Sequence, residues 1–164
     1  DNPLDIFVAQ NFFQIKTITT VDQHLNNFLP FFELSLKNYG HYCFDYLNFH
    51  DRKLAYLFLD KVCKNDNNVL IYPSGSIYTS IIKRFSKSVS KLSMINKLEV
   101  IAWKFIFNDQ ANIEYDRNIG KYILKRICSE KLVLQIGKVK VFNPKDFRSI
   151  EELHSDLCLF YLDS

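Results

Sequence analysis

Basic side chains at helical spacing are the residues in this sequence whose types and positions could do chemistry. Arg117, Lys121 and Lys125 recur every four residues, so a helix would place all three on one face. Lys138 and Lys140 follow in a segment that we expect to form a β-hairpin. Together these cations could neutralise several phosphates, and the release of counterions would make binding sensitive to salt. The pattern indicates a nucleic-acid-binding face, with an ordinary solvated helix surface as the alternative.

A second basic stripe has similar spacing and is open to the same two interpretations. Its members are Lys83, Arg84, Lys87 and Lys91. Acidic residues flank the first stripe and weaken its positive field. These acids are Asp109, Glu114, Asp116 and Glu130. Because the formal net charge is only +3, we expect protein binding to be the main function and direct nucleic-acid contact to be the alternative.

Residues for catalysis or metal binding are not arranged in a specific pattern. His41 and Cys43 are the one close His/Cys pair, and no second pair follows at zinc-finger spacing. There is no Gly-x-Ser-x-Gly motif, and the stretch 72–76 lacks the pattern of a phosphate-binding loop. Glu151 and Glu152 are adjacent on an expected helix, so their side chains point apart. The sequence therefore predicts no catalytic residue, no metal, no cofactor and no small-molecule substrate.

Composition places the chain among folded intracellular proteins. Of its 164 residues, 48% are apolar and 15% aromatic, which allows a sizeable core and argues against global disorder. No apolar run approaches the ~20 residues needed to cross a bilayer, and no signal peptide is evident. The four cysteines lack Cys-x-x-Cys spacing and lie in apolar runs, which favours reduced core thiols over disulfides. We expect a nuclear or cytoplasmic protein without membrane contact.

Hydrophobic periodicity predicts helices with a few short strands, a fold that is mainly α with short β-hairpins (α+β). The expected helices cover 25–36, 51–64, 76–92, 94–107, 117–130 and 147–161. The expected strands cover 12–19, 69–72, 131–136 and 139–142, the last two joined by a tight turn at Gly137-Lys138.

The second half has the element order of a winged helix, in which the helix 117–130 would enter the major groove and the hairpin would touch the flanking backbone. A degenerate copy of this order in the first half leaves two winged helices in tandem open. We therefore expect an N-terminal strand and helix at 1–40, a candidate linker from a preceding domain. A candidate first winged-helix-like domain at 41–92 and a winged-helix domain at 93–164 would follow.

The N-terminal stretch also carries a family resemblance. Residues 14–22, which begin Gln-Ile-Lys-Thr-Ile, and the apolar segment 29–36 resemble the exit from the OB fold in the Stn subunits of telomere-capping CST complexes. Those subunits continue into two winged helices, and residues 151–164 resemble a helix that closes such a domain. The middle subunit of replication protein A also ends in a winged helix, so the winged-helix superfamily is the broader alternative.

The resemblance implies a non-catalytic role in telomere maintenance at telomeric chromatin. It implies protein partners such as the large CST subunit or polymerase α–primase, and single-stranded DNA reached through the complex. From the sequence we thus expect a protein-interaction module of a multi-protein DNA-maintenance assembly, telomere-capping or telomerase-associated in the narrower interpretation. The alternatives are a winged-helix domain that binds single-stranded or duplex DNA in transcription or replication, and an enzyme of an unrecognised class.

Overall fold

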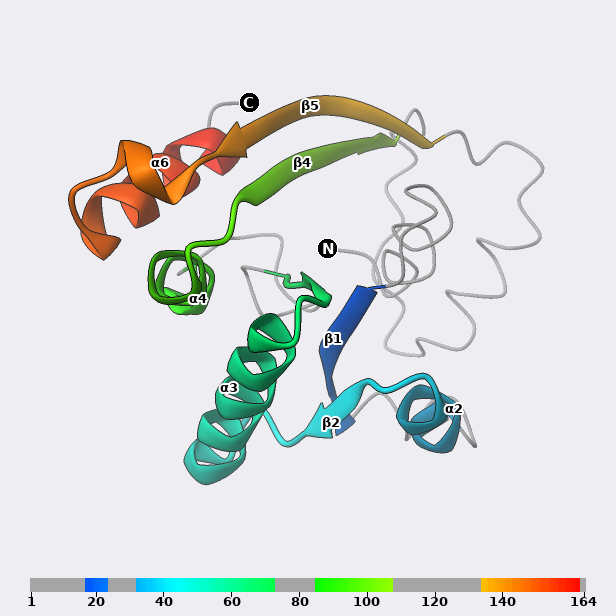
Figure 1. Cartoon of the computed structure of the whole chain (residues 1–164). Coiled ribbons are helices and arrows are strands. Elements are labelled where there is room, and N and C mark those ends of the chain that lie inside the picture. Colours follow the sequence, from blue (N-terminus) through cyan, green and yellow to red (C-terminus); the bar gives the residue numbers. More distant parts are fainter. Residues whose placement is uncertain (1–16, 24–31, 73–84, 108–133, 163–164) are drawn as a thin grey trace. The chain divides into compact units, whose positions relative to one another are not determined.

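The chain divides into two structural units, residues 1–81 and residues 82–164. The structure is a computed structural model that describes residues 17–23, 32–72, 85–107 and 134–162. Four α-helices and two small sheets occur in these described ranges (Figure 1). The expected mixed α+β class is therefore confirmed, whereas the three-part division at 1–40, 41–92 and 93–164 stays a prediction. None of the described helices is long and apolar enough to span a membrane.

A parallel sheet in the order β2-β1-β3 forms the framework of the first unit. β1 (Thr17–Asp22) lies in the centre, and both β2 (Tyr42–Phe44) and β3 (Asn68–Leu70) pair with it in parallel. Parallel neighbours need crossover connections, which here contain α2 (Phe32–Asn38) and α3 (Phe49–Lys64). The described β-α-β order does not confirm a winged helix in this half, because a wing is an antiparallel hairpin.

The longest described helix, α3, confirms the helix expected at 51–64 and follows from two local signals. Asn48 caps its start, since Oδ1 accepts hydrogen bonds from the backbone N–H groups of His50 (2.9 Å) and Asp51 (3.3 Å). Its buried residues recur at helical spacing and contact the sheet. They are Ala55, Leu59, Val62 and Cys63.

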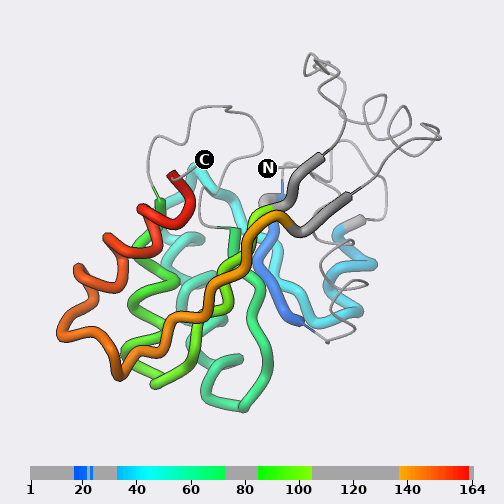
Figure 2. The backbone as a smooth tube through the Cα atoms, turned by 90° about the horizontal axis from the view of Figure 1, so that it is seen from above, coloured from blue at the N-terminus to red at the C-terminus, as the bar shows by residue number. Residues whose placement is uncertain are grey.

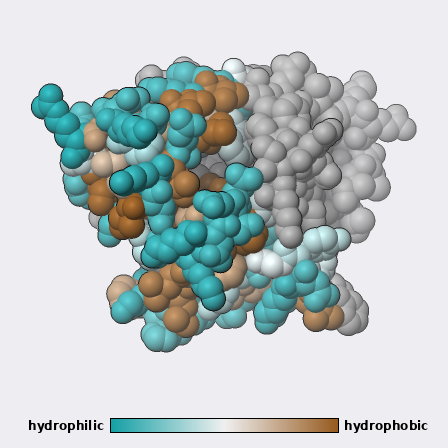
Figure 3. Space-filling model, in the orientation of Figure 1, coloured by the Kyte–Doolittle hydropathy of each residue, from teal (hydrophilic) through white to brown (hydrophobic). Residues whose placement is uncertain are grey.

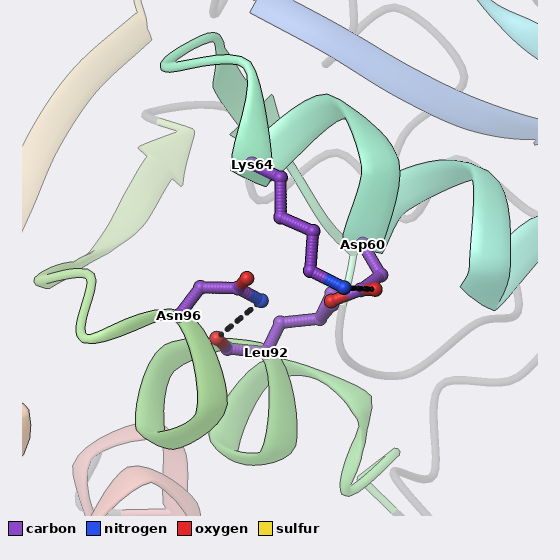
Figure 4. Close-up of polar contacts among 4 residues, drawn as sticks. All are labelled: Asp60, Lys64, Leu92 and Asn96. Atoms are coloured by element: carbon purple, nitrogen blue, oxygen red, sulfur yellow. Dashed lines mark hydrogen bonds and ion pairs between the residues drawn. The ribbon is translucent and has the colours of Figure 1, made fainter.

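Three described helices end in the same way, with one residue in the left-handed conformation. The three residues are Gly40 after α2 (φ 86°), Asp66 after α3 (φ 55°) and Lys97 after α4, Ser88–Asn96 (φ 56°). In each case the backbone N–H of the following residue donates a hydrogen bond to a carbonyl of the last helical turn, as in a Schellman motif. The bond from the N–H of His41 to the carbonyl of Leu36 is 2.9 Å long. Side chains add contacts in these last turns, because Lys64 pairs with Asp60 and Asn96 donates to the carbonyl of Leu92 (Figure 4).

An antiparallel ribbon of two long strands dominates the described part of the second unit. β4 (Val100–Phe107) pairs with β5 (Leu134–Phe142), and the two run side by side in Figures 1 and 2. α4 precedes the ribbon, while a short 3₁₀ turn (Pro144–Asp146) and α6 (Ile150–Leu162) follow it. α4 and α6 contact each other.

The core of this unit lies between one face of the ribbon and α6. Leu153, Leu157 and Phe160 recur at spacings of four and three, so they form one buried stripe of the helix. They pack with Ala102 of β4 and Phe142 of β5, whose side chains are almost fully buried. The helix expected at 147–161 is thus confirmed, with its start at Ile150.

Two expected elements of the second half are wrong. Residues 94–107 do not form one helix, because α4 ends at Asn96 and the stretch from Val100 onward, which is rich in β-branched and aromatic residues, forms β4. Gly137-Lys138 is not a hairpin turn, because β5 continues through it and pairs with β4. Gly137 is instead the extra residue of a β-bulge opposite Lys104 and Phe105.

The winged helix itself is not confirmed in the second half. The helix expected at 117–130, which would read the groove, lies outside the described residues. The expected strand 12–19 and the expected helix 25–36 are described only in part, as β1 and α2. The helix expected at 76–92 is wrong over residues 85–87, which are not helical, because α4 begins at Ser88.

Candidate interaction surface

The β4–β5 ribbon has two chemically different faces, which follow from the alternation of side chains along a strand. Ile101 lies directly opposite Val141, and Trp103 lies directly opposite Val139. These four side chains share one side of the ribbon, which we call the outer face. The other side, which α6 covers, carries the intervening residues Ala102 and Lys104 of β4 and Lys138, Lys140 and Phe142 of β5. We call it the inner face.

The outer face is apolar and open to solvent. Ile101, Val139 and Val141 remain 50%, 52% and 55% exposed, and Trp103 is half-buried beside them. Single exposed apolar residues are ordinary, but here they are cross-strand neighbours and form one continuous area. Figure 3 shows hydrophobic colour over this part of β4 and β5. A contiguous apolar area on a regular ribbon is typical of a protein-docking surface.

The ribbon edges are less suited to docking than the outer face. In the described sheet each strand has one neighbour, so each has one outer edge. Lys104, Lys138 and Lys140 together with the bulge at Gly137 discourage a further strand from pairing there. The geometry therefore favours side-chain docking on the outer face over extension of the sheet.

The inner face carries lysines that contact aromatic rings. The ammonium nitrogen of Lys138 lies 5.4 Å from the ring centroid of Phe160, and that of Lys140 lies 4.5 Å from the centroid of Phe142. Lys104, on the paired strand, lies 5.5 Å from the Phe160 centroid. Such contacts are attractive and hold the flexible lysine side chains in place.

The residues predicted from the sequence are only partly brought together. Lys138 and Lys140 both lie on β5, on the inner face, rather than in a hairpin turn. Arg117, Lys121 and Lys125 lie outside the described residues, as do Lys83 and Arg84.

The remaining members of the second stripe are described. Lys87 directly precedes α4 and makes no capping hydrogen bond with its side chain, and its ammonium group lies 3.7 Å from a carboxylate oxygen of Glu151. Lys91 is exposed one turn further along the helix. Pairing with Glu151 reduces the charge that Lys87 offers to a ligand, although an exposed pair of this kind contributes little stability.

Lys104 is the residue that sequence reasoning missed. It lies in the stretch Val100–Phe107, which was expected to be helical, so its position opposite Lys138 was not foreseen. The alternation Ile101, Trp103 on one side and Ala102, Lys104 on the other is the signal that would have found it.

The histidines and cysteines of the described part are partly or fully buried, except for the exposed His50. His41 is buried and accepts a hydrogen bond from Thr19, and burial lowers its pKa. His154 and Cys158 lie one turn apart on α6 with 3.7 Å between Nε2 and Sγ, and burial raises the pKa of the thiol. A thiol with a raised pKa is a poor nucleophile at neutral pH. Within the described ranges no three metal-binding side chains come together.

A second exposed apolar site lies in the first unit, at the turn before α3. Leu47 and Phe49 are strongly exposed, and the guanidinium of Arg52 lies between 5.7 and 5.8 Å from the rings of Tyr46 and Phe49. The carboxylate of Asp45 accepts a hydrogen bond from the Leu47 N–H at 2.8 Å, which fixes the turn. This site occupies one turn, whereas the outer face extends over two paired strands.

Comparison with known proteins gives no further assignment. No protein-family model matches the chain, and no curated protein sequence and no solved structure matches it either.

Proposed function

We propose that the protein is a non-catalytic interaction module that docks a partner protein on the outer face of the β4–β5 ribbon. The continuous exposed apolar area of Ile101, Val139 and Val141 carries this proposal. α6 packs on the opposite face and holds the ribbon in place, so the outer side chains are presented on a fixed support. Apolar anchors on rigid elements are what protein interfaces use at their centres.

The identity of the partner rests on the sequence. The likeness of residues 14–22 and 29–36 to Stn subunits supports a partner within a DNA-maintenance assembly, at telomeres in the narrower form, and a nuclear location. A winged-helix arrangement of residues 93–164 belongs to the same proposal. It would take its groove-binding helix from the segment 117–130, which lies between β4 and β5 in the sequence, and β4 and β5 would form its antiparallel pair in place of the hairpin expected at 131–142.

Replacement of the outer-face side chains tests the docking proposal. The triple variant Ile101→Thr, Val139→Thr, Val141→Thr keeps β-branched residues on the strands but makes the face polar. We expect this variant to lose the proteins that the unaltered chain retains from a nuclear extract, as quantified by mass spectrometry. Recovery of replication or telomere proteins would support the narrower assignment, and recovery of unrelated proteins alone would argue against it.

A matched control changes three exposed apolar residues elsewhere in the same unit. The control variant is Ile95→Gln, Leu159→Gln, Leu162→Gln. The three residues lie on α4 and α6 and are each more than half exposed, and glutamine is a residue that favours helix. The control should retain the same partner proteins as the unaltered chain. Equal retention by the outer-face variant would refute docking at this face, and a loss confined to Leu47→Gln would place docking at the turn before α3.

A further inference from the structure

We propose that Lys104, Lys138 and Lys140 on the inner face form a binding site for the phosphates of a nucleic-acid backbone. This goes beyond the docking function, since it concerns the other face of the ribbon and another class of ligand. It also differs from the groove-binding arrangement expected from the sequence, because its cations come from two paired strands and need no contribution from the segment 117–130.

The register of the ribbon brings the three cations together. Lys104 and Lys138 lie directly opposite each other, so their Cβ atoms are about 5 Å apart. Lys140 follows two residues along the same face of β5, a rise of about 7 Å. The three lysines therefore share one face of the ribbon and follow the direction of its strands, an arrangement that suits a polyanion lying along the strands.

Aromatic rings hold the cations in position. Two ammonium groups, those of Lys104 and Lys138, lie within 5.5 Å of the centroid of the Phe160 ring. Phe160 is buried and lies in edge-to-face contact with Phe142, the ring below Lys140. The lysine stems therefore rest on a fixed support, while Lys138 and Lys140 stay exposed to solvent. Such preorganisation lowers the entropy that binding would cost.

The charges of Lys138 and Lys140 are available. Among the described residues, Lys37, Lys64 and Lys87 each pair with a carboxylate, whereas no ion pair joins Lys138 or Lys140 to an acid. The cations also extend along a strand instead of converging on one point. A row of cations suits successive phosphates of a chain better than a single phosphate ion, and lysine contacts to phosphates carry no sequence information.

Fluorescence anisotropy with labelled oligonucleotides tests the proposal on the full chain. We expect salt-sensitive binding that does not depend on base sequence, measured with single-stranded DNA, duplex DNA and RNA. In the double variant Lys138→Gln, Lys140→Gln the slope of log K against log salt for duplex DNA should become shallower by about 2. Lys138→Arg, Lys140→Arg keeps both charges and should retain the original slope.

The control variant Lys53→Gln, Lys61→Gln removes the same charge from exposed positions of α3 and should leave the slope unchanged. Thermal melting confirms that each variant is folded. Absence of salt-sensitive binding by the unaltered chain would overturn the proposal, and so would an equal loss in the control or no loss in Lys138→Gln, Lys140→Gln. Displacement of the oligonucleotide by inorganic phosphate at matched ionic strength would show a single-anion site and would overturn the backbone assignment.

Discussion

The Nδ1 atom of His41 accepts a hydrogen bond of 3.2 Å from the backbone N–H of Thr19, and both residues are buried. The bond joins the central strand β1 to the residue that leads into β2. The Schellman motif at the end of α2 fixes the position of His41, because the backbone N–H of His41 donates a hydrogen bond to the carbonyl of Leu36. A ring nitrogen that accepts a hydrogen bond must be unprotonated, so this contact needs the neutral imidazole.

Acid should weaken the protein through His41. Burial lowers its pKa from the ordinary 6.5, so on acidification the unfolded chain takes up the proton before the folded chain does. The stabilisation is complete above pH 6.5 and is lost as pH falls below that value, by up to about 1.4 kcal/mol per pH unit. Urea unfolding between about pH 5 and pH 8 measures it.

His41→Gln serves as the comparison, because its amide oxygen can accept the bond from Thr19 but does not titrate. The difference in unfolding free energy between the unaltered chain and this variant should shrink as pH falls. His154, whose pKa is also lowered mainly by burial, titrates in both proteins and cancels. A difference that stays constant with pH would contradict the assignment.

Substitutions at Gly40 and Lys97, which adopt the left-handed conformation after α2 and α4, should change the free energy of unfolding in opposite directions. Gly40→Ala introduces a Cβ at φ 86°, and because no atom lies within 4 Å of that Cβ, the cost is conformational, about 1–2 kcal/mol. Lys97→Gly relieves the same strain at φ 56° after α4 and should add about 0.5 kcal/mol after the entropy of glycine is deducted. Urea unfolding curves give both values, and changes of the same sign would be inconsistent with this account.

The side-chain cap of α3 should contribute about 1 kcal/mol to the free energy of unfolding. Asn48→Ala removes the oxygen that accepts hydrogen bonds from His50 and Asp51, and leaves those N–H groups to water. Asn48→Asp keeps an acceptor next to the positive end of the helix dipole and should retain the stability. Chemical denaturation of the two variants checks this. Equal losses for Ala and Asp would show that the cap bonds do not matter.

The sequence predicted elements whose start and stop signals are local. The polar turn after α3 and the apolar stripes of α3 and α6 are visible in the sequence, so both helices were expected close to their observed positions. The start of α3 was expected at Asp51, whereas Asn48 caps the helix and Phe49 begins it. The helix expected at 94–107 was extended too far, because α4 ends at Asn96 and Lys97 after it adopts the left-handed conformation usual for glycine. Backbone bonds of the Schellman motif support that ending, and they leave no mark in the sequence.

The candidate site depended on pairing between distant strands, which the sequence did not predict. Gly137 was compatible with a turn or a bulge, and only the pairing of β5 with β4 decides between the two. The same pairing brings Lys104 opposite Lys138 and Ile101 opposite Val141. Lys138 and Lys140 were singled out from the sequence and lie on the same face of β5, whereas Lys104 opposite Lys138 and the apolar outer face could not be foreseen.

Trp103 should report which face of the ribbon a ligand occupies. It is the sole tryptophan and lies on the outer face opposite Val139. A partner protein that covers this face would transfer the indole from water to an apolar surrounding, so we expect its fluorescence emission to shift to shorter wavelength. Titration with the recovered partner should show this shift, and the variant Ile101→Thr, Val139→Thr, Val141→Thr should not. An oligonucleotide bound to the lysines should leave the emission wavelength unchanged, because those side chains lie on the inner face; a shift with DNA would place the nucleic acid on the outer face instead.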